Sequence, residues 1–308
     1  MMHPEEALQK AVNRRDFIAG TTSGVLGVLT MGATRNTQAQ QAPQQQPPAP
    51  QQPAAASPAG RVFYSAISGE TVQMRGFHGD TIDAYLARPA GKGKYPGVVV
   101  VHHMPGWDEP SIEIARKFAQ HGYTAICPNL HFRGGKATPE DNSAAMREAG
   151  GLSDASAMGD IEGAIRNLRA MRNLNGKVGI IGYCSGGRQV YLAACTLKGI
   201  DAAVACYPGG VGAGNAGLTP NQPVDPLDLT KDMSCPLMGI FGKEDKRPSP
   251  EHAAKMEAEL TKLGKTHEFH SYDNAGHSIF ATDRVDYRPL AAQDGWKNIF
   301  AWYEKYLG

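Results

Sequence analysis

Hydrophobic and polar residues alternate along two neighbouring segments, residues 72–76 and 82–88. A period of two residues is typical of a strand that buries one face. We therefore predict an antiparallel pair of strands at one edge of a sheet. Residues 97–103 follow another pattern, because Val98 to Val101 form an unbroken β-branched run. Such a run is typical of a parallel strand buried on both faces.

Apolar residues then recur at helical spacing in two longer segments. Over residues 112–121 they fall on one face of a helix, which Gly122 ends. Over residues 153–172 the apolar positions from Met158 to Met171 again share one face. Segments of both kinds continue in alternation. We predict strands at 123–127, 177–183, 202–207, 237–241 and 266–272, and helices at 186–198, 250–263 and 290–307.

Strands that alternate with helices indicate a parallel sheet covered by helices on both faces. We therefore predict an α/β fold with a mostly parallel central sheet, formed by one domain at residues 61–308. The segment at residues 208–234 is long and rich in Gly and Pro, and a loop of this length can form a lip or lid over a site.

The first sixty residues differ from the rest. Residues 13–18, Asn-Arg-Arg-Asp-Phe-Ile, resemble the twin-arginine export signature, and a weakly apolar stretch follows them. We expect residues 1–39 to be a twin-arginine signal peptide, and the Gln-, Pro- and Ala-rich residues 40–60 to be a disordered linker. The expected location is then the periplasm or the medium, with the twin-arginine translocase as a partner during export.

Charge and cysteine content narrow the functional classes. The chain has 31 Lys and Arg residues against 30 Asp and Glu residues, so nothing favours a nucleic acid as partner. No apolar run long enough for a membrane helix follows residue 60, and we expect no integral membrane segment after signal removal. The five cysteines are irregularly spaced and lack a Cys-x-x-Cys motif, which argues against a disulfide framework or structural zinc.

The sequence Gly-Tyr-Cys-Ser-Gly-Gly at residues 182–187 joins a predicted strand directly to a predicted helix. This is the nucleophile-elbow pattern of α/β-hydrolases, with Cys where Ser is usual. The nucleophile occupies a strained turn, so side chains two residues before and after it would collide. Gly182 and Gly186 fit those positions around Cys184, whereas centring on Ser185 would place a tyrosine where glycine is needed. We therefore predict Cys184 as nucleophile in an α/β-hydrolase fold.

A cysteine nucleophile needs a base, and the base needs a carboxylate that orients it. In α/β-hydrolases these partners follow in the order nucleophile, acid, histidine. Asp245 comes just after the predicted strand at 237–241, and His277 lies in the loop beyond the last predicted strand. Both positions belong to the sheet edge at which open α/β sheets bind ligands. Glu244 remains an alternative to Asp245.

The Gly-Tyr-Cys-x-Gly-Gly motif, the later Asp245 and the Gly-His-Ser sequence around His277 resemble the dienelactone hydrolase family, over roughly residues 70–308. The resemblance implies a triad of Cys184, His277 and Asp245 that opens an ester or lactone through a thiol acyl-enzyme. It also implies an oxyanion hole formed by the backbone N–H groups of Ser185 and Met104. The type enzyme of the family, carboxymethylenebutenolidase, converts dienelactone to maleylacetate.

Two positions depart from the family pattern. His103 stands about where the family has a glutamate that contacts the nucleophile. The family's arginine for the substrate carboxylate is missing, because Ile279, Phe280 and Ala281 follow Ser278. The fold and the reaction type are compatible with these changes, but dienelactone itself is not favoured as the natural substrate.

The adjacent His102 and His103 raise the question of a metal ion. Neighbouring strand residues point to opposite faces, so these two side chains cannot readily bind one ion. We therefore expect no metal and no organic cofactor. His103 and Tyr183, together with Trp107 and Arg133 in nearby loops, are candidates for the substrate pocket.

Taken together, the motifs predict an exported hydrolase of small esters or lactones. A carboxylesterase or small-amide hydrolase with the same triad is an alternative, as is a non-catalytic binding protein on the same fold. A binding protein has no need of a strained elbow matched by a base and an acid. The coincidence of Cys184, Asp245 and His277 therefore favours an enzyme.

Overall fold

The computed structural model describes residues 67–135 and 138–308. The predicted signal peptide at residues 1–39 and the predicted linker at residues 40–60 lie outside the described residues, as do residues 61–66 of the predicted domain. None of the helices in the described ranges is long and apolar enough to cross a membrane.

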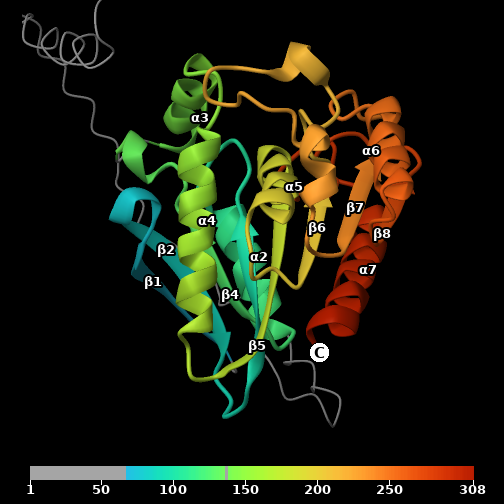
Figure 1. The fold of residues 1–308 in the computed structure, drawn as a ribbon. Coiled ribbons are helices and arrows are strands. Elements are labelled where there is room, and N and C mark those ends of the chain that lie inside the picture. The colour runs from blue at the N-terminus through green and yellow to red at the C-terminus, as the bar shows by residue number, and fades with distance from the viewer. Residues whose placement is uncertain (1–66, 136–137) are drawn as a thin grey trace, which may run out of the picture. The chain divides into compact units, whose positions relative to one another are not determined.

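An eight-stranded sheet forms the centre of the fold (Figure 1), with the strand order β1-β2-β4-β3-β5-β6-β7-β8. β2 runs antiparallel to both of its neighbours, β1 and β4, and the other neighbouring strands are parallel. This topology confirms the predicted α/β-hydrolase fold with its mostly parallel sheet. The strands are β1 (Ile67–Arg75), β2 (Thr81–Pro89), β3 (Tyr95–Val101), β4 (Thr124–Pro128), β5 (Leu174–Tyr183), β6 (Ala202–Cys206), β7 (Leu237–Gly242) and β8 (His267–Tyr272).

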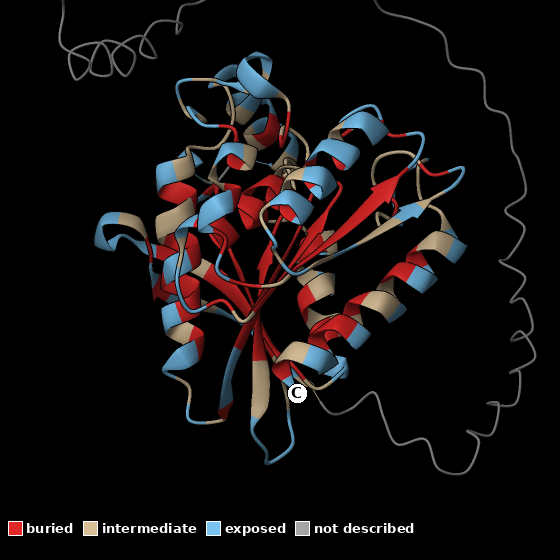
Figure 2. Ribbon diagram, turned by 45° about the vertical axis from the view of Figure 1, so that its right-hand side comes forward, coloured by how far each residue is buried: buried red, intermediate tan, exposed pale blue. Residues whose placement is uncertain are grey.

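Helices cover both faces of the sheet (Figures 1 and 2). α2 (Glu109–Gln120) and α7 (Pro289–Leu307) pack on one face. α4 (Asp154–Arg169), α5 (Ser185–Thr196) and α6 (Pro250–Lys262) pack on the other. In Figure 2 the central strands of the sheet are buried between these two layers, whereas the edge strands β1 and β8 are largely exposed or half-buried. Packing of helices on both faces therefore positions the strand ends at the carboxyl edge of the sheet.

The valine run in β3 shows how the two layers are separated. Val98 and Val100 belong to the apolar cluster on the side of α2 and α7, and Val99 and Val101 to the cluster on the opposite side. All four side chains are fully buried. Because successive strand residues point to opposite faces, only a strand covered on both sides requires an unbroken apolar run.

Besides two short 3-10 helices, η1 (Phe77–Gly79) and η2 (Phe132–Gly134), two segments contain helical turns that the hydrophobic pattern does not predict. α3 (Pro139–Glu148) has one buried residue, Ser143, so no apolar periodicity reveals it. Residues 208–234 include two short 3-10 helices, η3 (Gly214–Gly217) and η4 (Pro226–Asp232), and η4 packs against α5. This segment is thus partly anchored to the domain.

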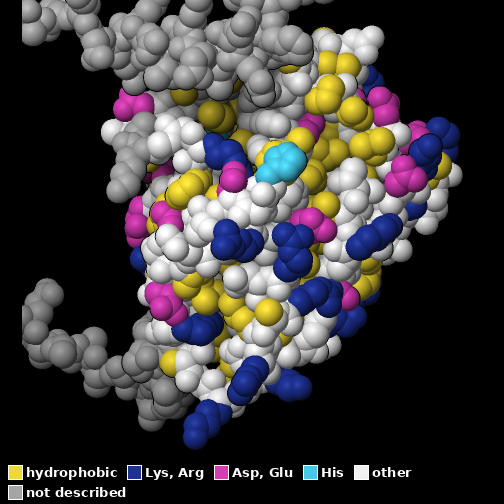
Figure 3. Space-filling model, turned by 60° about the vertical axis from the view of Figure 1, so that its left-hand side comes forward, with side chains coloured by type: hydrophobic (Ala, Val, Ile, Leu, Met, Phe, Trp, Pro, Cys, Tyr) yellow, Lys and Arg dark blue, Asp and Glu magenta, His cyan; other side chains and the backbone are white. Residues whose placement is uncertain are grey.

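Positive and negative side chains are mixed on the molecular surface. Figure 3 shows one face, on which Lys and Arg side chains alternate with Asp and Glu side chains and with apolar patches. Ion pairs of the described residues include Arg88 with Glu70 and Arg133 with Asp80.

Candidate active site

Cys184 lies at the turn between β5 and α5. Its backbone has φ 56° and ψ −119°, a conformation that residues with a side chain rarely adopt. Its amide donates to the carbonyl of Cys206 on the neighbouring strand at 3.1 Å, which holds the turn against the sheet. The thiol is thereby presented at the N-terminus of a helix and at the carboxyl edge of the sheet.

The glycines around Cys184 are required by close backbone contacts. A Cβ atom at Gly182 would lie 2.3 Å from the carbonyl oxygen of Gly186, and one at Gly186 would lie 2.4 Å from that of Val101. Real Cβ atoms do not approach oxygen so closely. The predicted collision of side chains at these two positions is therefore confirmed.

His277 and Asp245 meet at the same edge. His277 follows β8 and Asp245 follows β7, and the Nδ1–H of His277 donates to Oδ2 of Asp245 at 2.7 Å. Asp245 is buried, and its other carboxylate oxygen accepts from the amide of Arg247 at 2.8 Å. Glu244 is exposed, so Asp245 is the acidic residue that orients His277.

The side chain of Cys184 lies close enough to the His277 ring to affect its pKa. Burial lowers the pKa of His277, but the hydrogen bond to Asp245 and the interaction with Cys184 outweigh burial and raise this pKa to about 10. The three residues predicted from separate parts of the sequence therefore form one connected group. At neutral pH the His277 ring of this group is favoured as an imidazolium.

Cys184 also differs from the other cysteines in accessibility. It is partly exposed, whereas Cys127, Cys195, Cys206 and Cys235 are buried and none forms a disulfide. Burial raises the pKa of each of these four thiols. They are consequently poor nucleophiles, as expected for cysteines that act as small apolar residues.

The loop between β3 and α2 is fixed by His102, which is buried. Its Nδ1–H donates to the carbonyl of His103 at 2.9 Å, and its Nε2 accepts from the amide of Leu130 at 3.1 Å. Both bonds fit one neutral tautomer, and burial lowers the pKa of His102 to about 3. The carbonyl of His103 accepts a second bond from the amide of Gly106 at 3.0 Å.

His103 points away from His102 and toward Asp108. Its Nε2 hydrogen-bonds a carboxylate oxygen of Asp108 at 2.6 Å, while Asp108 caps α2 by accepting from the amide of Ser111. Burial raises the pKa of Asp108, but the bond to His103 dominates and lowers it to about 2. No group of three or more His, Cys, Asp or Glu side chains within residues 67–135 and 138–308 is placed to hold a metal ion.

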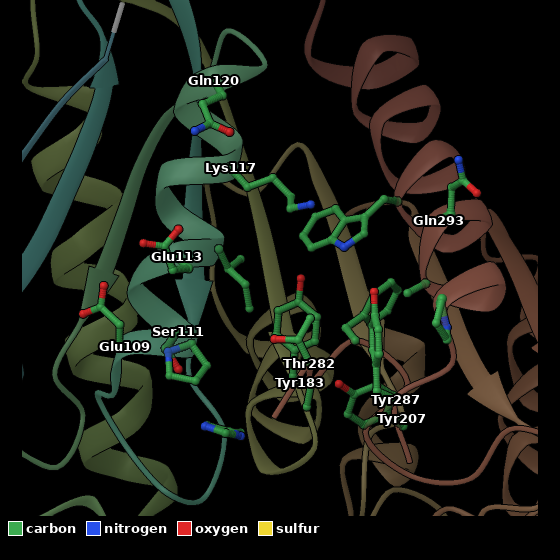
Figure 4. Close-up of a pocket in the computed structure, with 18 residues that line it drawn as sticks. Glu109, Ser111, Glu113, Lys117, Gln120, Tyr183, Tyr207, Thr282, Tyr287 and Gln293 are labelled. Atoms are coloured by element: carbon green, nitrogen blue, oxygen red, sulfur yellow. The ribbon is translucent and has the colours of Figure 1, made fainter. Parts of the chain in front are cut away.

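A cavity of about 640 Å³ lies between α2 and α7. Figure 4 shows its lining, which comes from α2 on one side and from α7 and the loop before it on the other. Its aromatic walls come from the ends of β5 and β6, the loop after His277 and α7. They are Tyr183, Tyr207, Phe280, Tyr287 and Trp296, of which sequence reasoning found only Tyr183 for the pocket.

Of the four proposed pocket residues, His103 and Tyr183 line this cavity, whereas Trp107 and Arg133 do not. The indole N–H of Trp107 donates to the carbonyl of Cys127 at 2.9 Å, so the ring turns inward. The guanidinium of Arg133 pairs with the buried carboxylate of Asp160 at 2.7 Å. Both side chains are occupied by structural contacts that their loop positions in the sequence do not reveal.

Comparison with known proteins agrees with the fold. The model of the dienelactone hydrolase family matches residues 82–307. This chain belongs to the dienelactone hydrolase family. It is accordingly a dienelactone hydrolase-like hydrolase.

Three relatives illustrate the similarity. A Methylorubrum extorquens protein named "Putative carboxymethylenebutenolidase" is 32% identical over 228 residues, which make up 73% of this chain and 77% of that protein. A Bradyrhizobium protein named "Probable 2-oxo-3-(5-oxofuran-2-ylidene)propanoate lactonase" is 30% identical over 253 residues, or 77% of this chain and 96% of that protein. The crystal structure of a "Putative Dienelactone Hydrolase" from Klebsiella pneumoniae has a TM-score of 0.71 and 29% identity, and covers 78% of this chain and 100% of that one.

Proposed function

We propose that this protein hydrolyses small carboxylic esters or lactones, with Cys184 as nucleophile, His277 as general acid and base, and Asp245 as the residue that orients His277. The observation that supports this most directly is the hydrogen bond between His277 and Asp245, with Cys184 beside the His277 ring at the strained elbow. The names of the relatives refer to lactone hydrolysis, which agrees with this substrate class.

In the proposed reaction the Cys184 thiolate attacks the substrate carbonyl carbon and forms a tetrahedral intermediate. The C–O bond to the leaving alcohol then breaks, and the His277 imidazolium gives its proton to that oxygen. Water attacks the thioester while neutral His277 takes its proton. The acid then leaves, and the thiolate and the imidazolium are regenerated. Asp245 stays ionised throughout and holds the ring in place.

We further propose that the amides of Ser185 and Met104 stabilise the oxyanion. Ser185 is the first residue of α5, where amides have no acceptor within the helix. The peptide between His103 and Met104 is trans, so its N–H points away from its C=O. Since two donors, His102 and Gly106, hold that carbonyl, they also fix the direction of the Met104 N–H.

The test of the nucleophile compares two variants of adjacent residues. Cys184→Ala should reduce turnover of a short ester by a factor on the order of 10⁴ or more, as loss of a triad nucleophile does. Ser185→Ala keeps its backbone N–H, so it should cost about tenfold or less.

Mass spectrometry of the enzyme quenched during turnover of a slow ester should find the acyl group on Cys184. An acyl label on Ser185, or inactivation that follows alkylation of one of the four buried cysteines, would overturn the assignment. Absence of any ester or lactone hydrolysis by pure protein with a free Cys184 thiol would instead favour a binding protein.

We also propose that the protein is exported by the twin-arginine route and acts in the periplasm or outside the cell. The support is the sequence Asn-Arg-Arg-Asp-Phe-Ile at residues 13–18 and the Gln-, Pro- and Ala-rich stretch that follows the weakly apolar segment. This route transports folded proteins, which fits a domain whose described cysteines are free thiols.

A further inference from the structure

The cavity between α2 and α7 begins beside the proposed catalytic residues. The ring of Tyr207, which lines it, lies 4.9 Å from the ring of His277, measured between centroids. Tyr183 is the neighbour of Cys184 in the chain, and His103 is the neighbour of Met104. Cys184, Asp245 and His277 do not themselves line the cavity, and it comes nearest to them at these three neighbouring residues.

The walls of the cavity favour a flat apolar group. Phe280 lies at the centre of an aromatic cluster, with ring centroids 5.4 Å from Trp296, 5.7 Å from Tyr183 and 6.4 Å from Tyr207. Aromatic pairs at such separations prefer offset or edge-to-face contacts, and a planar ligand ring can make the same contacts. The volume of about 640 Å³ lies within the range of small-molecule sites.

One polar atom of the cavity has no partner. The hydroxyl of Tyr183 is buried, and within the described residues it makes no hydrogen bond. Burying a hydroxyl without a partner is unfavourable, because the group loses its bonds to water. A ligand oxygen in the cavity would supply the missing acceptor. Figure 4 shows Tyr183 between the two helices, where such a ligand would lie.

The charges around the cavity leave one ammonium group without a counter-ion. Glu109 and Glu113 both pair with Arg116 on the same helix. Lys117 lies with its ammonium 4.8 Å from the ring centroid of Trp296, and it forms no salt bridge within the part of the chain that the structure describes. Because Asp108 is already paired with His103, the charge left for a ligand is positive.

From these features we propose that the groove between α2 and α7 binds the aromatic portion of an ester or lactone substrate, with a carboxylate on that ring directed to Lys117. The inference depends on the proposed hydrolase activity, since it concerns the substrate of the same site. It assigns Lys117 and Tyr183 as residues that determine substrate preference, and it gives them no part in bond breaking.

Three methyl esters test the proposal: methyl propanoate, methyl 3-phenylpropanoate and methyl 3-(4-carboxyphenyl)propanoate. The wild-type kcat/KM should rise along this series. Lys117→Gln should lower the ratio of kcat/KM between the carboxyphenyl and phenyl esters by at least about threefold. The matched control is Lys305→Gln on α7, since Lys305 also lies over an aromatic ring, that of Tyr306, but does not line the groove. It should leave the ratio at the wild-type value.

A second variant uses binding rather than turnover. Tyr183→Phe removes a hydroxyl without a partner, so the melting temperature of the free protein should not fall. Its affinity for the product acid, 3-(4-carboxyphenyl)propanoate, should nevertheless fall by about threefold or more. Equal kcat/KM for the three esters, or a ratio that Lys117→Gln leaves unchanged, would overturn the groove proposal alone. Failure to hydrolyse any of a wider panel of esters and lactones would overturn the proposed activity instead.

Discussion

At the scale of single residues, His277 links a buried carboxylate to a partly exposed thiol. Because its pKa is raised to about 10 on folding, it stays protonated through neutral pH. Its contribution to the free energy of unfolding is therefore complete below about pH 6.5, the ordinary pKa of histidine. This contribution is lost as the pH rises through about 10. A positive charge on His277 beside Cys184 is present over the same range.

Replacing His277 with Asn tests this linkage. The variant lacks the cation beside Cys184, so alkylation by iodoacetamide at pH 6 should slow by at least about tenfold. Its rate should then rise with pH through about 8.5, as it does for an unassisted thiol. The wild type should react rapidly already at pH 6. Identical pH profiles for the two proteins would argue against the ion pair.

The residues of the proposed triad could be predicted because each follows a strand. A glycine-flanked cysteine, an acid and a histidine at successive strand ends leave few alternatives, and burial then separates Asp245 from Glu244. Tyr207 could have been found in the same way, since it directly follows β6. The inward turn of Trp107 toward the carbonyl of Cys127 has no signal in the local sequence.

At the scale of elements, the conformation of the loop from β3 to α2 depends on the buried side chain of His102. His102→Phe removes the donor to the His103 carbonyl, which frees the peptide whose N–H we assign to the oxyanion hole. We expect kcat for a short ester to fall by about 10 to 100-fold, with little change in KM. His102→Gln retains a donor and an acceptor and should recover much of the loss.

Alkylation provides the control for this loop. Iodoacetamide reacts with Cys184 without forming an oxyanion, so its rate should be the same in the wild type and in His102→Phe. A parallel loss of alkylation and turnover would mean that the substitution disturbs the elbow itself. In that case His102 would support the fold and not the oxyanion hole.

The elements also show where a hydrophobic pattern is informative. The strands and the helices on the sheet are predicted because burial imposes a period on them, as the valines of β3 illustrate. α3 lacks such a period, although Thr138 and Pro139 give it an ordinary helix start, with Thr138 accepting from the amide of Asp141. The cavity could not be predicted, because α2 and α7 are distant in the sequence and nothing in the local pattern of either helix shows that they lie side by side.

For the whole molecule, the predicted signal peptide at residues 1–39 and the hydrolase domain are expected to act independently. Replacing Arg14 and Arg15 with Lys should leave the protein in the cytosol with its esterase activity intact, because the twin-arginine pair is read only during export. Cell fractionation with activity assays measures this. A chain that starts at Arg61 is the control and should be soluble with an unchanged turnover number. Periplasmic delivery of the double variant would exclude dependence on this route.

The distribution of the five thiols has a consequence for chemical durability. Four are shielded in the apolar clusters and Cys184 alone is partly open to solvent, so a small oxidant such as peroxide meets one reactive sulfur first. Conversion of that thiol to a sulfenic acid would inactivate the enzyme while leaving its packing intact, and a thiol reductant would restore the activity. The molecule would thus lose activity to oxidation long before it loses its fold.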